Sequence, residues 1–227
     1  DLVSVEWNDC AEEILRKAGS LQDQLKNYQT MVLYLCSHLC EVPEVLKEEK
    51  WIPLFVKDTG GAYLRVSAES HITRLNMPQE GNQKWGASRV HKSRVNSLPQ
   101  MLQEAWYALW AGFSYSGSEK VGEIQFYLCK NMNEEFSLKS VAEKYHFSEP
   151  YFCTLFKKGT GMSVIHFVQH VRVHYGTYLI RNSEKKLQEI AEEVGFENYS
   201  YFGKLFKRYV GQTPEAYREG SEGKLGI

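Results

Sequence analysis

The sequence contains no run of eighteen apolar residues and no positively charged, apolar leader at its start. A helix needs about 20 apolar residues to cross a bilayer, and a secreted precursor needs such a leader. We therefore expect a cytoplasmic protein that has no membrane partner. The cysteine count is odd and shows no disulfide-scaffold spacing, which favours reduced thiols. The first residue is Asp1 rather than Met, so we keep open a domain upstream of it.

The constellations that carry catalysis are also missing. The sequence has no Ser/His/Asp set and no phosphate-binding loop. His166, His170 and His174 share one face of a predicted helix, but no acid or cysteine lies near them in the sequence, so a half-polar face explains them better than a metal site. On the helix expected at residues 9–47, Cys36 and Cys40 would share a face as core residues. We predict that the protein is not an enzyme and needs no cofactor or metal.

Acidic residues are absent from two long stretches, although the formal net charge of the whole chain is only −1. Residues 151–182 and 198–214 contain no Asp or Glu, whereas residues 184–197 contain five glutamates. The acid-free stretches carry lysines and arginines instead. Local positive charge of this kind is typical of surfaces that meet nucleic-acid phosphates.

The two acid-free stretches overlap a repeated sequence. LKSVAEKYHFSEPYFCTLFKKGTG at residues 138–161 and LQEIAEEVGFENYSYFGKLFKRYVG at residues 187–211 share ten identical positions, once a one-residue insertion at the turn is allowed. Each repeat is typical of a helix, a short turn and a second, basic helix. Two such units are expected to contact duplex DNA in two successive grooves.

Local signals support the same elements. Ser137 is a predicted N-cap, and Pro150 suits the first turn of a second helix. His146 stands where the second repeat has Gly195, at a turn position that favours positive φ. In the first repeat, the second helix carries an apolar stripe that is expected to pack in the core, formed by Tyr151, Phe152, Leu155 and Phe156.

The opposite face of each second helix is the candidate DNA-reading surface. Its residues are Glu149, Pro150, Cys153, Thr154, Lys157 and Lys158 in the first repeat, and Asn198, Tyr199, Ser200, Gly203, Lys204, Lys207 and Arg208 in the second. The first residues of a recognition helix point at base edges, and cations one or two turns later meet phosphates. Lys204 is a candidate donor to guanine, and Thr154 is a candidate contact to a base edge or a thymine methyl group.

The stretch FENYSYFGKLFKRYVGQTPEAYR at residues 196–218 resembles the signature of the AraC/XylS transcription regulators. The resemblance extends over residues 120–219 and implies two helix-turn-helix units joined by one long helix, here expected at 163–181. It implies base-reading positions at Pro150, Cys153 and Thr154 in the first unit, and at Tyr199, Ser200, Gly203 and Lys204 in the second. It also implies double-stranded DNA and RNA polymerase as partners, with activation of transcription as the usual outcome.

The N-terminal half begins with a predicted helix over residues 9–47, followed by a new turn or short helix at Pro43. The helix prediction rests on three- and four-residue spacing of apolar side chains, among them Leu21, Leu25, Tyr28, Val32, Leu35 and Leu39. This apolar stripe would pack within its own module or pair with a second copy in a homodimer, and both alternatives stay open.

Residues 51–117 change character. Two apolar runs around an Asp-Thr-Gly-Gly turn predict a hairpin within residues 51–77. A short strand is expected at 85–90 and a helix at 98–113, before the linker SYSGS at 114–118.

The stretch GASRVHKSRVNSLPQMLQEAWYALWAGFSYSG at residues 86–117 resembles the end of the linker module in YesN-type response regulators. There a degenerate, cyclase-like α/β domain lies between a phosphate-accepting receiver and an AraC-type DNA-binding domain. A sensor histidine kinase is then a partner if a receiver lies upstream, because neither a receiver nor a Gly-Gly-Asp/Glu-Glu-Phe cyclase signature occurs in this chain. The alternative is a ligand-sensing AraC-type regulator whose N-terminal module binds a small effector.

The expected fold class is an α+β N-terminal module followed by an all-α domain of two helix-turn-helix units joined by a long helix. We expect residues 1–117 to form a linker, regulatory or dimerisation module and residues 118–220 to form the DNA-binding domain. Within the second domain, helices are also expected at 121–131 and 214–219. Residues 221–227 are expected to be a flexible tail.

Overall fold

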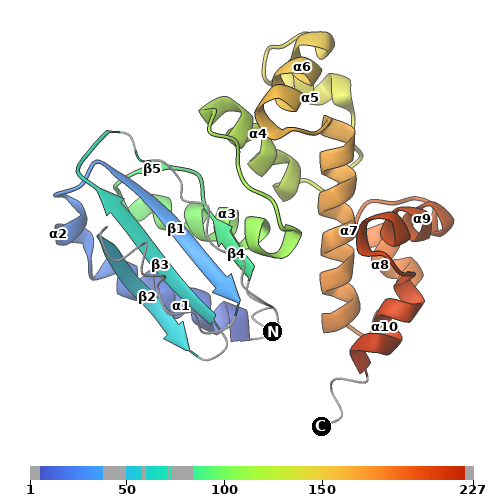
Figure 1. The fold of residues 1–227 in the computed structure, drawn as a ribbon, viewed down its shortest axis with the longest axis horizontal. Helices are drawn as coiled ribbons and strands as arrows, with labels where there is room; N and C mark the ends of the chain where they lie inside the picture. The colour runs from blue at the N-terminus through green and yellow to red at the C-terminus, as the bar shows by residue number, and fades with distance from the viewer. Residues whose placement is uncertain (1–5, 38–49, 58–59, 71, 73–83, 223–227) are drawn as a thin grey trace. The chain divides into compact units, whose positions relative to one another are not determined.

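The computed structural model describes residues 6–37, 50–57, 60–70, 72 and 84–222. The chain divides into two compact units, Asp1–Tyr115 and Ser116–Ile227 (Figure 1). All five tryptophans of the sequence belong to the first unit, so tryptophan fluorescence reports on that unit alone. Among the described residues, no helix has the length and apolar character needed to cross a membrane.

The first unit is an α+β module built on an antiparallel sheet (Figure 1). Its strands are β1 (Thr30–Ser37), β2 (Trp51–Lys57), β3 (Gly60–Ser67), β4 (Lys84–Ala87) and β5 (His91–Lys92). The strand order is β2-β3-β1-β4, and β5 pairs with β1 beside β4. Its helices are α1 (Glu6–Gly19), the short α2 (Gln22–Leu25) and α3 (Leu98–Ala111), which follows a 3₁₀ turn at Val95–Ser97.

The central strand β1 corrects the predicted helix over residues 9–47. Met31, Leu33 and Leu35 of β1 join the core cluster that contains α1 and α3, whereas Val32 and Tyr34 belong to a cluster on the opposite face of the sheet. All five side chains are at most 1% exposed. A strand that is buried on both faces has a continuous apolar sequence, and such a run can also match helical spacing.

The assignment of residues 30–37 to a strand also corrects two other predictions. Val32 and Leu35 lie in the sheet, so the long helical stripe considered for homodimerisation does not form. Cys36 is a buried strand residue rather than a helical one. The partner cysteine, Cys40, and the predicted turn at Pro43 lie outside the described residues.

The remaining elements of the first unit agree with the sequence. β2 and β3 form the predicted hairpin, although Asp58 and Thr59 at its turn lie outside the described residues. β4 overlaps the strand expected at 85–90 and starts one residue earlier, and α3 starts at the predicted residue but ends at Ala111, two residues before the predicted end. The apolar side of α3, including Met101 and Ala105, packs on β1.

The second unit is entirely helical in its described part (Figure 1). Its helices are α4 (Glu119–Lys130), α5 (Leu138–Lys144), α6 (Glu149–Thr160), α7 (Val164–Asn182), α8 (Leu187–Glu193), α9 (Tyr199–Val210) and α10 (Pro214–Glu222). The long helix expected at 163–181 is confirmed as α7. α10 continues beyond its predicted end, and residues 223–227 of the expected tail lie outside the described residues.

Backbone conformation at the α5–α6 turn gives a stability prediction. His146 has φ 60°, and its counterpart Gly195 has φ 86°. A residue with a Cβ costs about 1–2 kcal/mol in this region, and glycine offsets part of that through its larger loss of chain entropy, about 0.5–1 kcal/mol. We expect His146→Gly to raise the free energy of unfolding of the second unit by about 0.5–1 kcal/mol, measured by urea unfolding followed by far-UV circular dichroism.

The matched control is His146→Ala, which removes the imidazole but keeps a Cβ at positive φ. It should give no stabilisation, and tryptophan fluorescence of the first unit should not shift in either variant. Equal stabilisation by both variants would assign the effect to the imidazole rather than to the backbone.

Candidate nucleic-acid interface

Two helix pairs, α5–α6 and α8–α9, pack against α7 in the second unit. Their turns have the same backbone geometry. Phe147 N donates to the carbonyl of Ala142, and Phe196 N donates to the carbonyl of Ala191, each at 2.9 Å. The sequence repeat is therefore also a repeat of local structure.

The second helix of each pair begins differently. Asn198 caps α9, because its Oδ1 accepts a hydrogen bond from Tyr201 N at 3.1 Å. Ser148 is the N-cap residue of α6 but makes no side-chain cap bond, and the first turn of α6 contains Pro150 and Glu149. The carboxylate of Glu149 suits the positive end of the helix dipole. Asn198 and Glu149, both expected to face DNA, therefore also serve the helix starts.

The inner face of α6 and α9 is aromatic. Phe152 and Phe156 of α6, like Phe202 and Phe206 of α9, are fully buried. Leu155 is half-buried. The buried side chains anchor both helices to the core of the second unit, so the opposite side of each helix faces outward.

Tyr151 departs from the predicted core stripe. Its side chain is 55% exposed, and its repeat counterpart Tyr201 is 48% exposed. Neighbouring helix residues are about 100° apart around the axis, so Tyr151 leaves the side that Phe152 buries. The Tyr201 hydroxyl accepts a hydrogen bond from Gln169 Nε2 of α7 at 2.8 Å. These outward tyrosines were missed, although their identity in both repeats was a usable signal.

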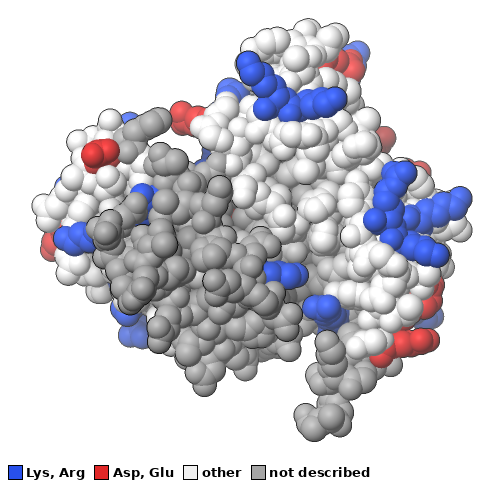
Figure 2. Space-filling model, in the orientation of Figure 1, with Lys and Arg blue, Asp and Glu red and all other residues white. Residues whose placement is uncertain are grey.

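The outer face of the two helices carries the predicted site residues. Exposed side chains are Glu149, Pro150, Thr154, Lys157 and Lys158 on α6, with Asn198, Ser200, Lys204, Lys207 and Arg208 at α9. Cys153, Tyr199 and Gly203 are half-buried. Figure 2 shows Lys and Arg gathered over α6 and over α9 on one side of the molecule. Within the described part of the chain, none of these five cations has an acidic partner.

Two predicted base-reading side chains have partners within the protein. Thr154 Oγ1 donates to the carbonyl of Pro150 at 2.9 Å, so its hydroxyl is bonded within α6. The Tyr199 hydroxyl donates to the carboxylate of Glu215 in α10. Burial, together with this hydrogen bond and the charge of Glu215, raises the pKa of Tyr199 well above its usual range. The hydrogen bond from Tyr199 also lowers the pKa of Glu215.

The three histidines of α7 follow one helix side without forming a ligand set. The rings of His170 and His174 have centroids 4.3 Å apart, and His170 also contacts the ring of Tyr209. Across the residues that the structure describes, no group of three or more His, Cys, Asp or Glu side chains is arranged to hold a metal.

The second unit is similar to known proteins. Residues 141–220 match the family described as a helix-turn-helix domain. Over 105 residues the chain is 37% identical to the bifunctional transcriptional activator/DNA repair enzyme AdaA of Bacillus subtilis, which is 46% of this chain and 50% of that protein. Over 101 residues it is 32% identical to the transcriptional activator RhaR of Yersinia pseudotuberculosis, which is 44% of this chain and 35% of that protein.

Among solved structures, the C-terminal domain of the two-component response regulator yesN from Fusobacterium nucleatum is 33% identical, with a TM-score of 0.43, over 44% of this chain and 99% of that chain. The chain spans half the length of AdaA and about a third of RhaR. The second unit therefore contains an AraC-type helix-turn-helix domain.

Proposed function

We propose that this chain is the sequence-specific DNA-binding part of a transcription activator. In this proposal α5–α6 and α8–α9 are two helix-turn-helix units, and α6 and α9 enter successive segments of the major groove. The observation that carries it is the repeated cationic pair Lys157–Lys158 and Lys207–Arg208, which is exposed on the outer side of both helices. Cations at these positions suit contacts with phosphates on either side of a groove.

The proposed roles differ along each helix. Pro150, Cys153 and Thr154 on α6, and Ser200, Gly203 and Lys204 on α9, face the bases. Thr154 is exposed, and its methyl group suits a thymine methyl, whereas the Lys204 ammonium suits the guanine acceptors. Glu149, Asn198 and Tyr199 contribute mainly by holding the helix starts, as supported by the Asn198 cap and the bond from Tyr199 to Glu215.

The first unit is proposed as the linker, regulatory or dimerisation module of a YesN-type response regulator. The support is the resemblance of residues 86–117 together with the α+β fold of this unit. In such a protein a receiver upstream accepts phosphate from a sensor histidine kinase, and the DNA-bound protein contacts RNA polymerase.

A selection from random duplex oligonucleotides with the full chain tests the DNA-binding function. We expect two enriched half-motifs whose centres lie about 10 base pairs apart, one turn of B-DNA. A matched selection with Lys157→Ala/Lys207→Ala should enrich the same motifs more weakly. No enrichment, or a single motif with no second half, would contradict the proposed use of both helices.

Lys157 gives a prediction about salt dependence. Lys157→Ala should weaken binding to all sequences alike and make the slope of log Kobs against log salt shallower by about one unit, because one phosphate contact is lost. Fluorescence anisotropy between low and moderate salt measures the slope. Lys139→Ala is the control, since Lys139 is an exposed lysine of α5 that lies 4.0 Å from Glu143. A loss confined to one base position would instead make Lys157 a base-reading residue.

A further inference from the structure

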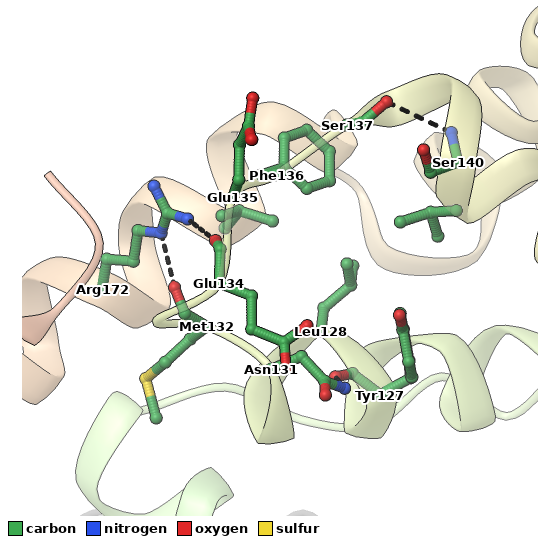
Figure 3. A pocket seen from close by; sticks show the side chains of 12 residues that line it. Tyr127, Leu128, Asn131, Met132, Glu134, Glu135, Phe136, Ser137, Ser140 and Arg172 are labelled. Carbon is green, nitrogen blue, oxygen red and sulfur yellow. Dashed lines mark hydrogen bonds between the residues drawn. The ribbon is translucent and has the colours of Figure 1, made fainter. Parts of the chain in front are cut away.

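Arg172 of α7 is bonded to three separate backbone carbonyls. Its Nε donates to Met132 at 2.7 Å, its Nη2 to Glu134 at 2.6 Å and its Nη1 to Gly195 at 2.6 Å. Figure 3 shows the first two bonds at a pocket that residues of α4, α5 and α7 line. Every nitrogen of the guanidinium group therefore has its own acceptor.

Two of these carbonyls lie in the segment that leads into the first helix pair, and the third lies within the second pair. Met132 and Glu134 lie in the connection between α4 and α5, just before the N-cap Ser137 and the start of the first pair. Gly195 lies in the turn between α8 and α9 of the second pair. The Arg172 side chain of α7 thus binds the segment that leads into α5 and also the turn between α8 and α9.

The site is shaped for an arginine. A guanidinium group is planar and presents donors in a rigid fork, which a lysine ammonium does not. A Cβ on residue 195 would lie 2.8 Å from Cζ of Arg172, so any other residue at that turn would displace the guanidinium group from this position. Among the described residues, no Asp or Glu side chain forms an ion pair with Arg172. Its charge is therefore satisfied by backbone dipoles, whose positions it holds in return.

We propose that Arg172 is a positioning residue that sets the separation and relative angle of α6 and α9. The inference rests on the proposed use of both helices on DNA. Two linked contacts reinforce each other only when their geometry matches the two half-sites. Loosening this three-carbonyl bridge therefore affects joint binding far more than either contact alone.

The DNA test uses three kinds of duplex. The first carries both half-motifs at the selected spacing, the second carries both with one base pair added or removed between them, and the third carries a single half-motif. For Arg172→Ala we expect the affinity for the full site to fall about tenfold or more. Affinity for a single half-motif should change less than about twofold, and discrimination between spacings should flatten. Arg172→Lys, which cannot reach all three carbonyls, should give an intermediate loss and covers the case in which the alanine variant fails to fold.

The matched control is Arg181→Ala. It removes the same charge from the same helix, but Arg181 lies over the ring of Tyr217 in α10, which is outside both helix pairs. Spacing discrimination should persist in this variant. Equal losses on full and single sites for Arg172→Lys, or unchanged spacing discrimination, would overturn the inference.

A second measurement needs no DNA. Spin labels at Lys158→Cys and Arg208→Cys, in a Cys153→Ser background, occupy equivalent exposed positions of α6 and α9. The distribution of distances between them should broaden in Arg172→Lys and stay narrow in Arg181→Ala. If the unaltered chain selects no DNA, the proposed function is wrong, but the distance measurement still tests whether Arg172 positions α6 and α9. An unchanged distribution in Arg172→Lys would show that the bridge does not position the helices.

Discussion

Replacing Glu104 with Gln is expected to lower the free energy of unfolding of the first unit by about 3–5 kcal/mol, because it removes one member of a buried ionic network. The Glu104 side chain is fully buried in α3. Its Oε2 accepts a hydrogen bond from Arg89 N at 2.9 Å and lies 2.9 Å from His91 Nε2. Its Oε1 accepts from Arg89 Nε and Gln100 Nε2, both at 2.9 Å.

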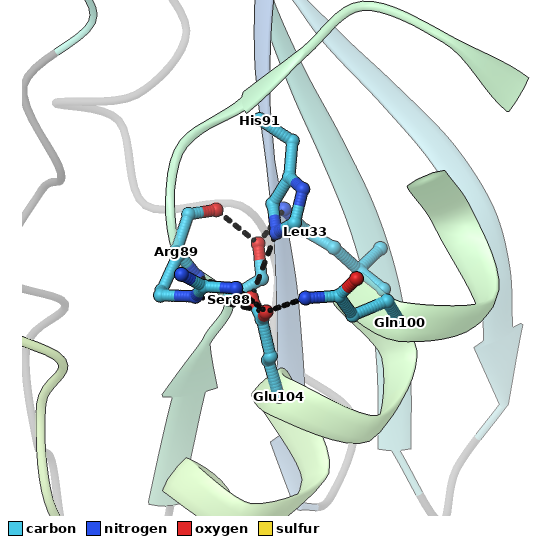
Figure 4. Close-up of polar contacts among 6 residues, drawn as sticks. All are labelled: Leu33, Ser88, Arg89, His91, Gln100 and Glu104. Atoms are coloured by element: carbon cyan, nitrogen blue, oxygen red, sulfur yellow. Dashed lines mark hydrogen bonds and ion pairs between the residues drawn. The ribbon is translucent and has the colours of Figure 1, made fainter. Parts of the chain in front are cut away.

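The network connects α3 to the sheet (Figure 4). Ser88 Oγ donates to the carbonyl of Arg89 and accepts from Leu33 N of the central strand β1. A glutamine at 104 keeps the volume of the side chain but leaves the Arg89 guanidinium without its carboxylate. The large cost comes from that charge, whose side chain is only 15% exposed, rather than from a lost contact.

The effect has a defined pH dependence. Burial raises the pKa of Glu104, but the hydrogen bonds and charges of His91 and Arg89 outweigh it, so the folded pKa lies below the ordinary value. A carboxyl group with a depressed folded pKa stabilises the fold above its unfolded pKa, about 4.3, and loses this contribution as the pH falls through the folded pKa. The difference between the parent chain and Glu104→Gln should therefore be full at pH 7 and shrink below about pH 4.

Urea unfolding followed by tryptophan fluorescence measures this difference, since every tryptophan lies in the first unit. Gln103→Ala, at the neighbouring exposed position of α3, is the control and should change stability by less than about 0.5 kcal/mol. A Glu104→Gln difference that stays constant from pH 7 to pH 3 would contradict the role of the carboxylate charge.

Replacing Lys204 with Ala is expected to weaken binding to the selected DNA site by about 1–3 kcal/mol, roughly 5- to 150-fold in Kd. Lys204 is exposed on the outer side of α9, and its neighbour Gly203 has open space where a Cβ would stand. An unobstructed ammonium in the first turns of a recognition helix can reach the O6 and N7 acceptors of guanine. Loss of a base contact, unlike loss of a phosphate contact, should also relax the preference at one position of the motif.

Repeated oligonucleotide selection with Lys204→Ala and anisotropy titration on the parent motif measure both effects. Lys120→Ala is a suitable control, because Lys120 is an exposed lysine of α4 that pairs with Glu123. An unchanged motif accompanied by a uniform loss of affinity would make Lys204 a phosphate contact.

Local chemistry made much of the second unit predictable. The Ser137 cap, the positive φ at His146 and Gly195, and the start of α10 at Pro214 all follow from the properties of single residues. The outer face of α6 and α9 could be proposed for the same reason, because helical periodicity separates it from the buried phenylalanines. The assignment of the outward tyrosines failed, because neighbouring helix residues lie about 100° apart around the axis, and periodicity alone does not decide which of them the core accepts.

The first unit was harder to predict. The run from Thr30 to Ser37 satisfies helical spacing as well as a buried strand, and only its pairing with β3 and β4 decides between them. Strand pairing depends on partners that are distant along the chain, which no window of local sequence contains.

By itself, the sequence determined the repeat, its caps and turns, and the cationic outer faces, since these depend on residues within a few positions of one another. Tertiary structure alone decided that β1 is a strand, that Glu104 is buried among Arg89 and His91, and that Arg172 bridges both helix pairs. Arg172 reaches acceptors 23, 38 and 40 residues away. Such contacts exist only after long-range packing has brought the backbone together, because their free energy depends on burial and geometry that no local pattern encodes.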